Sequence, residues 1–189
     1  MIRATLMVVL AALASCTIRT HEDPREIFEE RTARTLLVVA APLVFARERS
    51  DVAAHARDYV TLVAVEIDES GEYKQYLLSY RWSTVDRRML APPDPHAGSL
   101  RIVADGRVID LKPLDYFPLS FEKRRELLVP NHGDIFARAY TVDVQMLNFI
   151  AASRNLTVRL PQEPLDIPLK LWEDGRGALA QFLKRAEGP

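Results

Sequence analysis

The pattern of apolar and polar residues is most regular between Tyr59 and Trp82. Apolar or β-branched side chains recur at every second position of its first half (Tyr59, Thr61, Val63, Val65 and Ile67). They recur again in its second half (Tyr76, Leu78, Tyr80 and Trp82). The polar run Asp68–Gly71 separates the two halves. Alternation with a period of two on both sides of a glycine-containing turn predicts an antiparallel hairpin.

A second hairpin is predicted around Asp105 and Gly106, because this dipeptide readily adopts the positive φ angles of a tight hairpin turn. Its strands are Leu100–Val103 and Val108–Leu111. Three further strands are predicted at Thr35–Phe45, Ala137–Val142 and Leu156–Leu160.

The strand at Thr35–Phe45 contains Pro42, which cannot donate a ladder hydrogen bond. We therefore expect an edge strand, a bulge or two short strands there. The segments Ala91–Pro95 and Pro130–Asp134 are predicted loops, and Phe121–Leu128 fits either a short helix or a strand.

Helix signals are fewer and lie mostly late in the chain. Asp23 followed by Pro24 predicts the start of a short helix, and Asp143 predicts the N-cap of another. The second helix has apolar residues at helical spacing on one face (Met146, Leu147, Ile150 and Ala151). A C-terminal helix has the same pattern (Leu179, Phe182, Leu183 and Ala186).

Together these patterns predict a mainly β (α+β) protein, with a single antiparallel β-sandwich-like domain over residues 35–189. Two or three short helices, one of them C-terminal, accompany the sheets. The length of 189 residues suits one domain, and 48% hydrophobic residues argue against disorder. A net charge of −1 argues against general nucleic-acid binding, which needs a basic surface.

The N-terminus carries a targeting pattern. Arg3 is followed by the apolar run Leu6–Leu13, which is too short to cross a bilayer, and then by Ala14, Ser15 and Cys16. Residues 1–16 resemble the lipobox signal peptide of bacterial lipoproteins. An ordinary signal peptide with a cysteine near its cleavage site is the alternative.

The resemblance implies that residues 1–15 are removed and that Cys16 is acylated, for example with palmitate. Residues 16–34 then form the lipidated cysteine, a tether and the short helix. Because Thr17, not aspartate, follows the cysteine, the resemblance favours the periplasmic face of the outer membrane over the inner membrane. Two or more acyl chains are needed for stable anchoring.

Candidate chemistry is sparse. The single cysteine excludes an internal disulfide and any multi-thiolate zinc site. We predict no catalytic residues, no metal site and no cofactor. His132 and Asp134 could form a general base, but a tight polar loop is the better explanation for them. The aromatic stripe Tyr76, Tyr80 and Trp82 is typical of a core face, and its alternative is an exposed ligand site.

These observations favour a non-catalytic, membrane-anchored envelope lipoprotein that binds a protein partner or assists an envelope assembly. The first alternative is a periplasmic module that binds a glycan or a small apolar molecule through Tyr80 and Trp82. The second is a hydrolase that uses His132 and Asp134.

Overall fold

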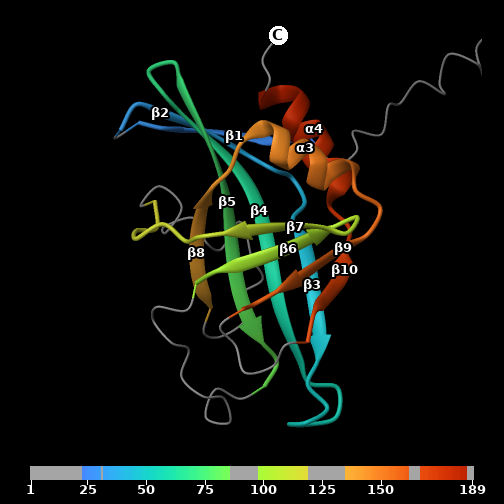
Figure 1. Cartoon of the computed structure of the whole chain (residues 1–189). Coiled ribbons are helices and arrows are strands. Elements are labelled where there is room, and N and C mark those ends of the chain that lie inside the picture. The colour runs from blue at the N-terminus through green and yellow to red at the C-terminus, as the bar shows by residue number, and fades with distance from the viewer. Residues whose placement is uncertain (1–22, 31, 86–97, 119–134, 162–166, 187–189) are drawn as a thin grey trace, which may run out of the picture.

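The computed structural model describes residues 23–30, 32–85, 98–118, 135–161 and 167–186. The described residues form strands and two helices in the order β1 (Arg25–Glu29), β2 (Arg34–Val38), β3 (Leu43–Glu48), β4 (Arg57–Glu69), β5 (Glu72–Ser83), β6 (Leu100–Ala104), β7 (Arg107–Leu111), β8 (Phe136–Thr141), α3 (Val144–Ala152), β9 (Leu156–Arg159), β10 (Leu169–Glu173) and α4 (Arg176–Ala186) (Figure 1). The expected mainly antiparallel β-sandwich-like fold with a C-terminal helix is confirmed.

The two longest strands, β4 and β5, form the predicted hairpin. They are joined by the two-residue turn Ser70–Gly71, in which both residues have positive φ angles (59° and 86°). Asp68 accepts a hydrogen bond from the Gly71 N–H at 2.7 Å and so holds the turn. The turn fixes the register, because it places Glu69 opposite Glu72 and every later pair follows from that one.

The predicted interruption at Pro42 is also confirmed, as two short strands. β2 pairs with the last part of β4 and β3 with its first part, so both share one edge of β4. The bend between them is packed tightly. A Cβ atom on Gly175 would lie 2.4 Å from the Pro42 carbonyl oxygen, so only glycine permits this approach between α4 and the bend.

The sheet curls into two layers. Along one path its strands follow the order β1-β2-β4-β3-β10-β9-β6-β7, and on the other edge of β4 they continue through β5 to β8. Figure 1 shows β6 and β7 crossing β4 and β5 at a large angle. Two hydrogen bonds near β8 connect the layers. The Tyr140 hydroxyl donates to the Gly98 carbonyl oxygen at 2.6 Å, and the Leu114 N–H donates to the Ala139 carbonyl oxygen at 2.8 Å.

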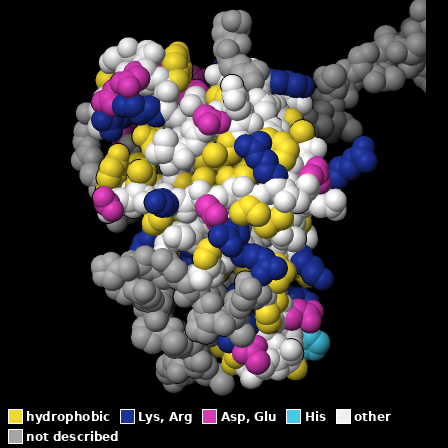
Figure 2. Space-filling model, viewed as in Figure 1, with side chains coloured by type: hydrophobic (Ala, Val, Ile, Leu, Met, Phe, Trp, Pro, Cys, Tyr) yellow, Lys and Arg dark blue, Asp and Glu magenta, His cyan; other side chains and the backbone are white. Residues whose placement is uncertain are grey.

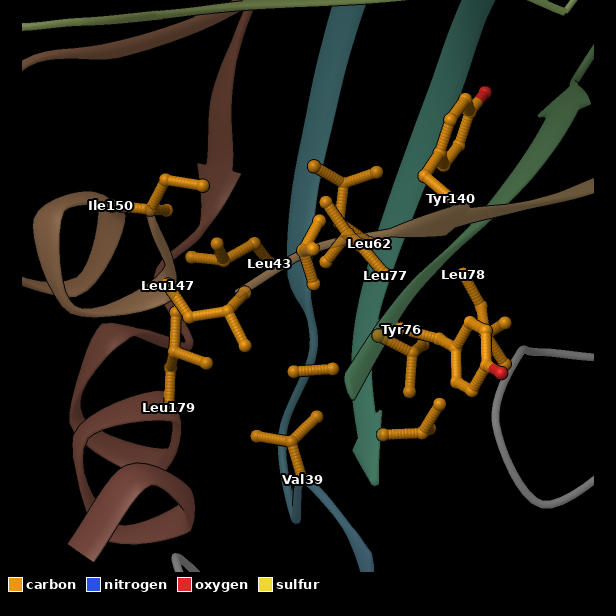
Figure 3. Close-up of a cluster of buried hydrophobic side chains, with 14 of the residues drawn as sticks. Val39, Leu43, Leu62, Tyr76, Leu77, Leu78, Tyr140, Leu147, Ile150 and Leu179 are labelled. Atoms are coloured by element: carbon orange, nitrogen blue, oxygen red, sulfur yellow. The ribbon is translucent and has the colours of Figure 1, made fainter. Parts of the chain in front are cut away.

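Both faces of the β4–β5 hairpin are buried along its central part. Leu62 and Leu77 point towards the helices, and Leu78 points to the opposite side (Figure 3). These three side chains are at most 2% exposed. The inner face packs against Leu147 and Ile150 of α3 and against α4, so the helices and the second sheet layer together close the core.

Both helices follow their predicted patterns. The Asp143 carboxylate accepts a hydrogen bond from the Met146 N–H at 2.6 Å, which makes Asp143 the N-cap of α3. Leu179, Phe182 and Leu183 form the buried face of α4. No helix among the described residues is long and apolar enough to span a bilayer.

Two elements differ from the expectations. The helix predicted after Asp23 and Pro24 is wrong, because Arg25–Glu29 forms strand β1, which pairs with β2 along its whole length. Strand β10 was not predicted. The predicted loops at 91–95 and 130–134, and the ambiguous segment 121–128, lie outside the described residues.

One buried carboxyl interrupts the apolar inner face. Glu66 is 5% exposed and accepts a hydrogen bond from Gln75 Nε2 at 2.6 Å. Burial raises the pKa of Glu66 above its ordinary value of 4.5, the hydrogen bond from Gln75 opposes this rise, and the negative charge of Asp68 adds to it. A neutral side chain of the same shape would avoid the cost of burying a charge.

We therefore expect Glu66→Gln to raise the urea midpoint of unfolding at pH 7 and to change it much less near pH 4. The raised pKa means that Glu66 favours the folded state below its ordinary pKa and loses this contribution as the pH rises through the folded-state value. The exposed Glu173→Gln is the control and should show no such pH dependence. An equal shift at both pH values would contradict the explanation.

Candidate functional site

A stacked aromatic pair lies at one end of the β4–β5 hairpin. Tyr59 and Trp82 are directly opposite each other, and their rings stack with centroids 3.9 Å apart and planes within 8°. Trp82 Nε1 donates to the Thr61 hydroxyl at 3.4 Å. Trp82 packs against the core and is partly buried, and Tyr59 is also only partly buried. The stacked pair is therefore fixed by the core and still partly accessible to solvent.

A third aromatic ring joins this pair from a strand distant in the sequence. Trp172 meets Tyr59 edge to face, with centroids 6.5 Å apart. It lies at a bulge in β10, where the pairing with β3 shifts between Leu171 and Glu173. Strand β3 lies between the two strands that carry these rings, with Ala46 opposite both Tyr59 of β4 and Lys170 of β10.

One of the three rings, Trp172, has a cation over it, and this cation also pairs with Glu48 at 3.4 Å. The Arg57 guanidinium carbon lies 4.6 Å from the Trp172 ring centroid, and Trp172 is 54% exposed. We call Tyr59, Trp82, Trp172 and Arg57 the aromatic platform. Its flat apolar surfaces and its guanidinium suit a ligand that buries apolar area and also presents a carboxylate or a π-system.

An ion-pair network supports the adjoining positions of β3 and β4. Asp58 accepts hydrogen bonds from Arg47 at 2.9 Å and from Arg49 at 3.0 Å. Arg49 also binds Asp51, and this hydrogen bond lowers the pKa of the Asp51 carboxyl. Arg47 is 7% exposed, so the network fixes the strand ends from the inside while Arg57 stays at the surface.

A groove of about 520 Å³ lies near the other end of the hairpin. It is lined by both apolar and charged side chains (Arg34, Ile67, Glu69, Lys74, Tyr76, Tyr116, Phe117 and Pro118). Arg34 and Glu69 form an ion pair of 2.6 Å there, and burial raises the pKa of Tyr76. The cations of the two places are alike in having an acidic partner, because Arg34 pairs with Glu69 in the groove and Arg57 pairs with Glu48 at 3.4 Å beside the platform.

The aromatic stripe predicted from the sequence is divided by the structure. Tyr76 is 8% exposed and Tyr80 is fully buried, with its ring edge against Phe117 at 6.1 Å. Only Trp82 reaches the platform. Cys16, His132 and Asp134 lie outside the described residues.

Three platform residues were missed by sequence reasoning. Tyr59 could have been found from the hairpin register, because a turn at Ser70–Gly71 places it opposite Trp82. Trp172 and Arg57 meet only through the long-range pairing of β10, β3 and β4. No group of three or more His, Cys, Asp or Glu residues that could hold a metal ion occurs in the described part of the chain.

Comparison with known proteins adds no relative: no protein-family model, curated protein or solved structure matches the chain. Functional inference therefore rests on the residues of this chain.

The stacked pair should contribute to stability as a unit. In a double-mutant cycle of Tyr59→Ala and Trp82→Ala, we expect a coupling free energy of about 0.5–1.5 kcal/mol in urea unfolding. The matched cycle of Tyr59→Ala with Trp172→Ala should give a smaller value, because Trp172 is half exposed and contacts only a ring edge. Additive single effects for Tyr59 and Trp82 would show that their stacking contributes nothing.

Proposed function

We propose that this chain is a bacterial envelope lipoprotein, anchored by acylated Cys16, whose β domain binds a protein partner through the aromatic platform. The observation that carries the partner-binding part is the exposed Trp172 ring against Tyr59, with Arg57 over its face. Trp, Tyr and Arg are the residues most enriched at the energetic centres of protein interfaces. The anchor rests on the sequence of residues 1–16.

The separation between the start of β1, which follows the proposed tether in the chain, and the platform is consistent with this arrangement. Arg25, the first residue of β1, lies opposite Val38, which in turn lies opposite Val65 of β4. Tyr59 is six positions from Val65, about 20 Å along the strand. The start of β1 and the platform therefore lie at different places on the sheet.

The anchor is tested by metabolic labelling with a palmitate analogue. We expect the wild-type chain to be labelled and to sediment with outer-membrane vesicles, and Cys16→Ser to be unlabelled and released. Thr17→Ser is the control and should keep the label. A labelled, membrane-bound Cys16→Ser chain would refute acylation at this residue.

The platform is tested by in-cell photocrosslinking from a benzoylphenylalanine at position 173, next to Trp172. We expect a discrete protein adduct. Trp172→Ala should raise the dissociation constant of this partner about 30-fold, which is the effect expected of a strong interface residue. The same probe at Val108, which is 53% exposed on β7, is the control and should not give this adduct.

An adduct that persists unchanged in Trp172→Ala and in Arg57→Ala contradicts the platform as the partner site. Loss of binding to purified peptidoglycan in these variants, without a protein adduct, would replace the protein partner with a glycan.

A further inference from the structure

Strand β1 is an edge of the sheet. It pairs with β2 on one side, and within the described residues it has no strand neighbour on the other side. Phe28, on this strand, is 60% exposed. An open edge offers backbone donors and acceptors to another extended chain, and such edges pair unless the sequence prevents it.

The sequence of β1 matches itself in the antiparallel direction. It reads Arg25, Glu26, Ile27, Phe28 and Glu29. If Ile27 lies opposite the same residue of a second copy, Arg25 of each copy lies opposite Glu29 of the other. The pair of strands then has two cross-strand ion pairs around an isoleucine contact, and each Phe28 covers the stem of Glu26.

Other registers lose this match. A shift of one position in one direction puts Glu26 opposite Glu29 twice, and like charges directly opposite each other are destabilising. A shift of one position the other way puts Arg25 opposite Phe28 and removes both ion pairs. A shift of two positions puts either Glu26 opposite Glu26 or Ile27 opposite Glu29. Only the register centred on Ile27 gives two ion pairs and no like-charge pair.

We propose that β1 is a self-association edge, through which a second copy of this chain joins in antiparallel register about a two-fold axis at Ile27. The two sheets then continue into each other across the interface. Charged side chains on β1 protect the edge from arbitrary partners and permit the one partner that presents the reversed charge order.

The membrane anchor strengthens this association but is not required for it. A pair of five-residue strands buries less area than a standard stable interface, so the dimer is weak in solution. Residues 16–24 can extend about 30 Å, enough for both tethers to reach one bilayer when the two-fold axis lies along the membrane normal. Confinement to one surface raises the effective concentration of the second copy.

The register is tested by disulfide trapping with Ile27→Cys in the full chain in isolated membranes. Directly opposite residues of an antiparallel pair have Cα atoms about 4.5–5.5 Å apart, within the range of a disulfide. We expect mild oxidation to give a 27–27 linked dimer, identified by mass spectrometry. Val108→Cys, on the exposed edge strand β7, is the matched control and should stay monomeric.

The charge match is tested by reversal in the Ile27→Cys background. Arg25→Glu should lower the linked fraction about tenfold, and Arg25→Glu combined with Glu29→Arg should restore it, because the ion pairs are rebuilt with their signs exchanged. Glu29 also lies opposite Arg34 in its own chain, so the unfolding midpoint of each variant is measured to separate folding from association.

The same trapping is repeated with Cys16→Ser in solution at high protein concentration. A linked dimer in solution would support self-association through β1 even if acylation of Cys16 is refuted. Linkage of Ile27→Cys no greater than that of Val108→Cys, or unchanged linkage in Arg25→Glu, overturns the proposal.

Discussion

The pairing of β4 with β5 is the interaction on which the rest of the structure depends. Twelve residue pairs join these strands, and the Ser70–Gly71 turn sets their register. β2 and β3 attach to the free edge of β4, and β8 attaches to the free edge of β5. A slip of one residue in one strand would turn its side chains to the opposite face, so the packing on both faces of the hairpin would be lost. The same register stacks Tyr59 on Trp82.

One face of this hairpin serves two purposes along its length. At its centre, Leu78 and Tyr80 are completely buried and contribute to stability. At its end, Trp82 is only partly covered and continues into the rings of Tyr59 and Trp172. A stripe of aromatic residues is thus neither wholly core nor wholly binding surface. The division coincides with the end of the pairing of β5 with β8 at Arg81, one residue before Trp82, which the alternation of residues does not reveal.

Local signals in the sequence predicted most of the fold, and long-range pairing accounts for what they missed. The turns at Ser70–Gly71 and Asp105–Gly106 and the cap at Asp143 each act within a few residues, so their hairpins and helix were predicted correctly. Asp23 and Pro24 gave an equally local helix signal, but pairing of β1 with β2 overrides it. β10, and with it Trp172, is placed by β3 and β9, so the platform could be only half predicted.

The two proposed surfaces are geometrically compatible. A two-fold axis at Ile27, perpendicular to the sheet, leaves each face of the joined sheet on the same side in both copies. Tyr59 and Trp82 lie on one face of the hairpin, so both platforms would point to the same side of a dimer. A partner that repeats, such as an oligomeric envelope protein, would then be held at two points, and weak contact at each platform would suffice for stable binding.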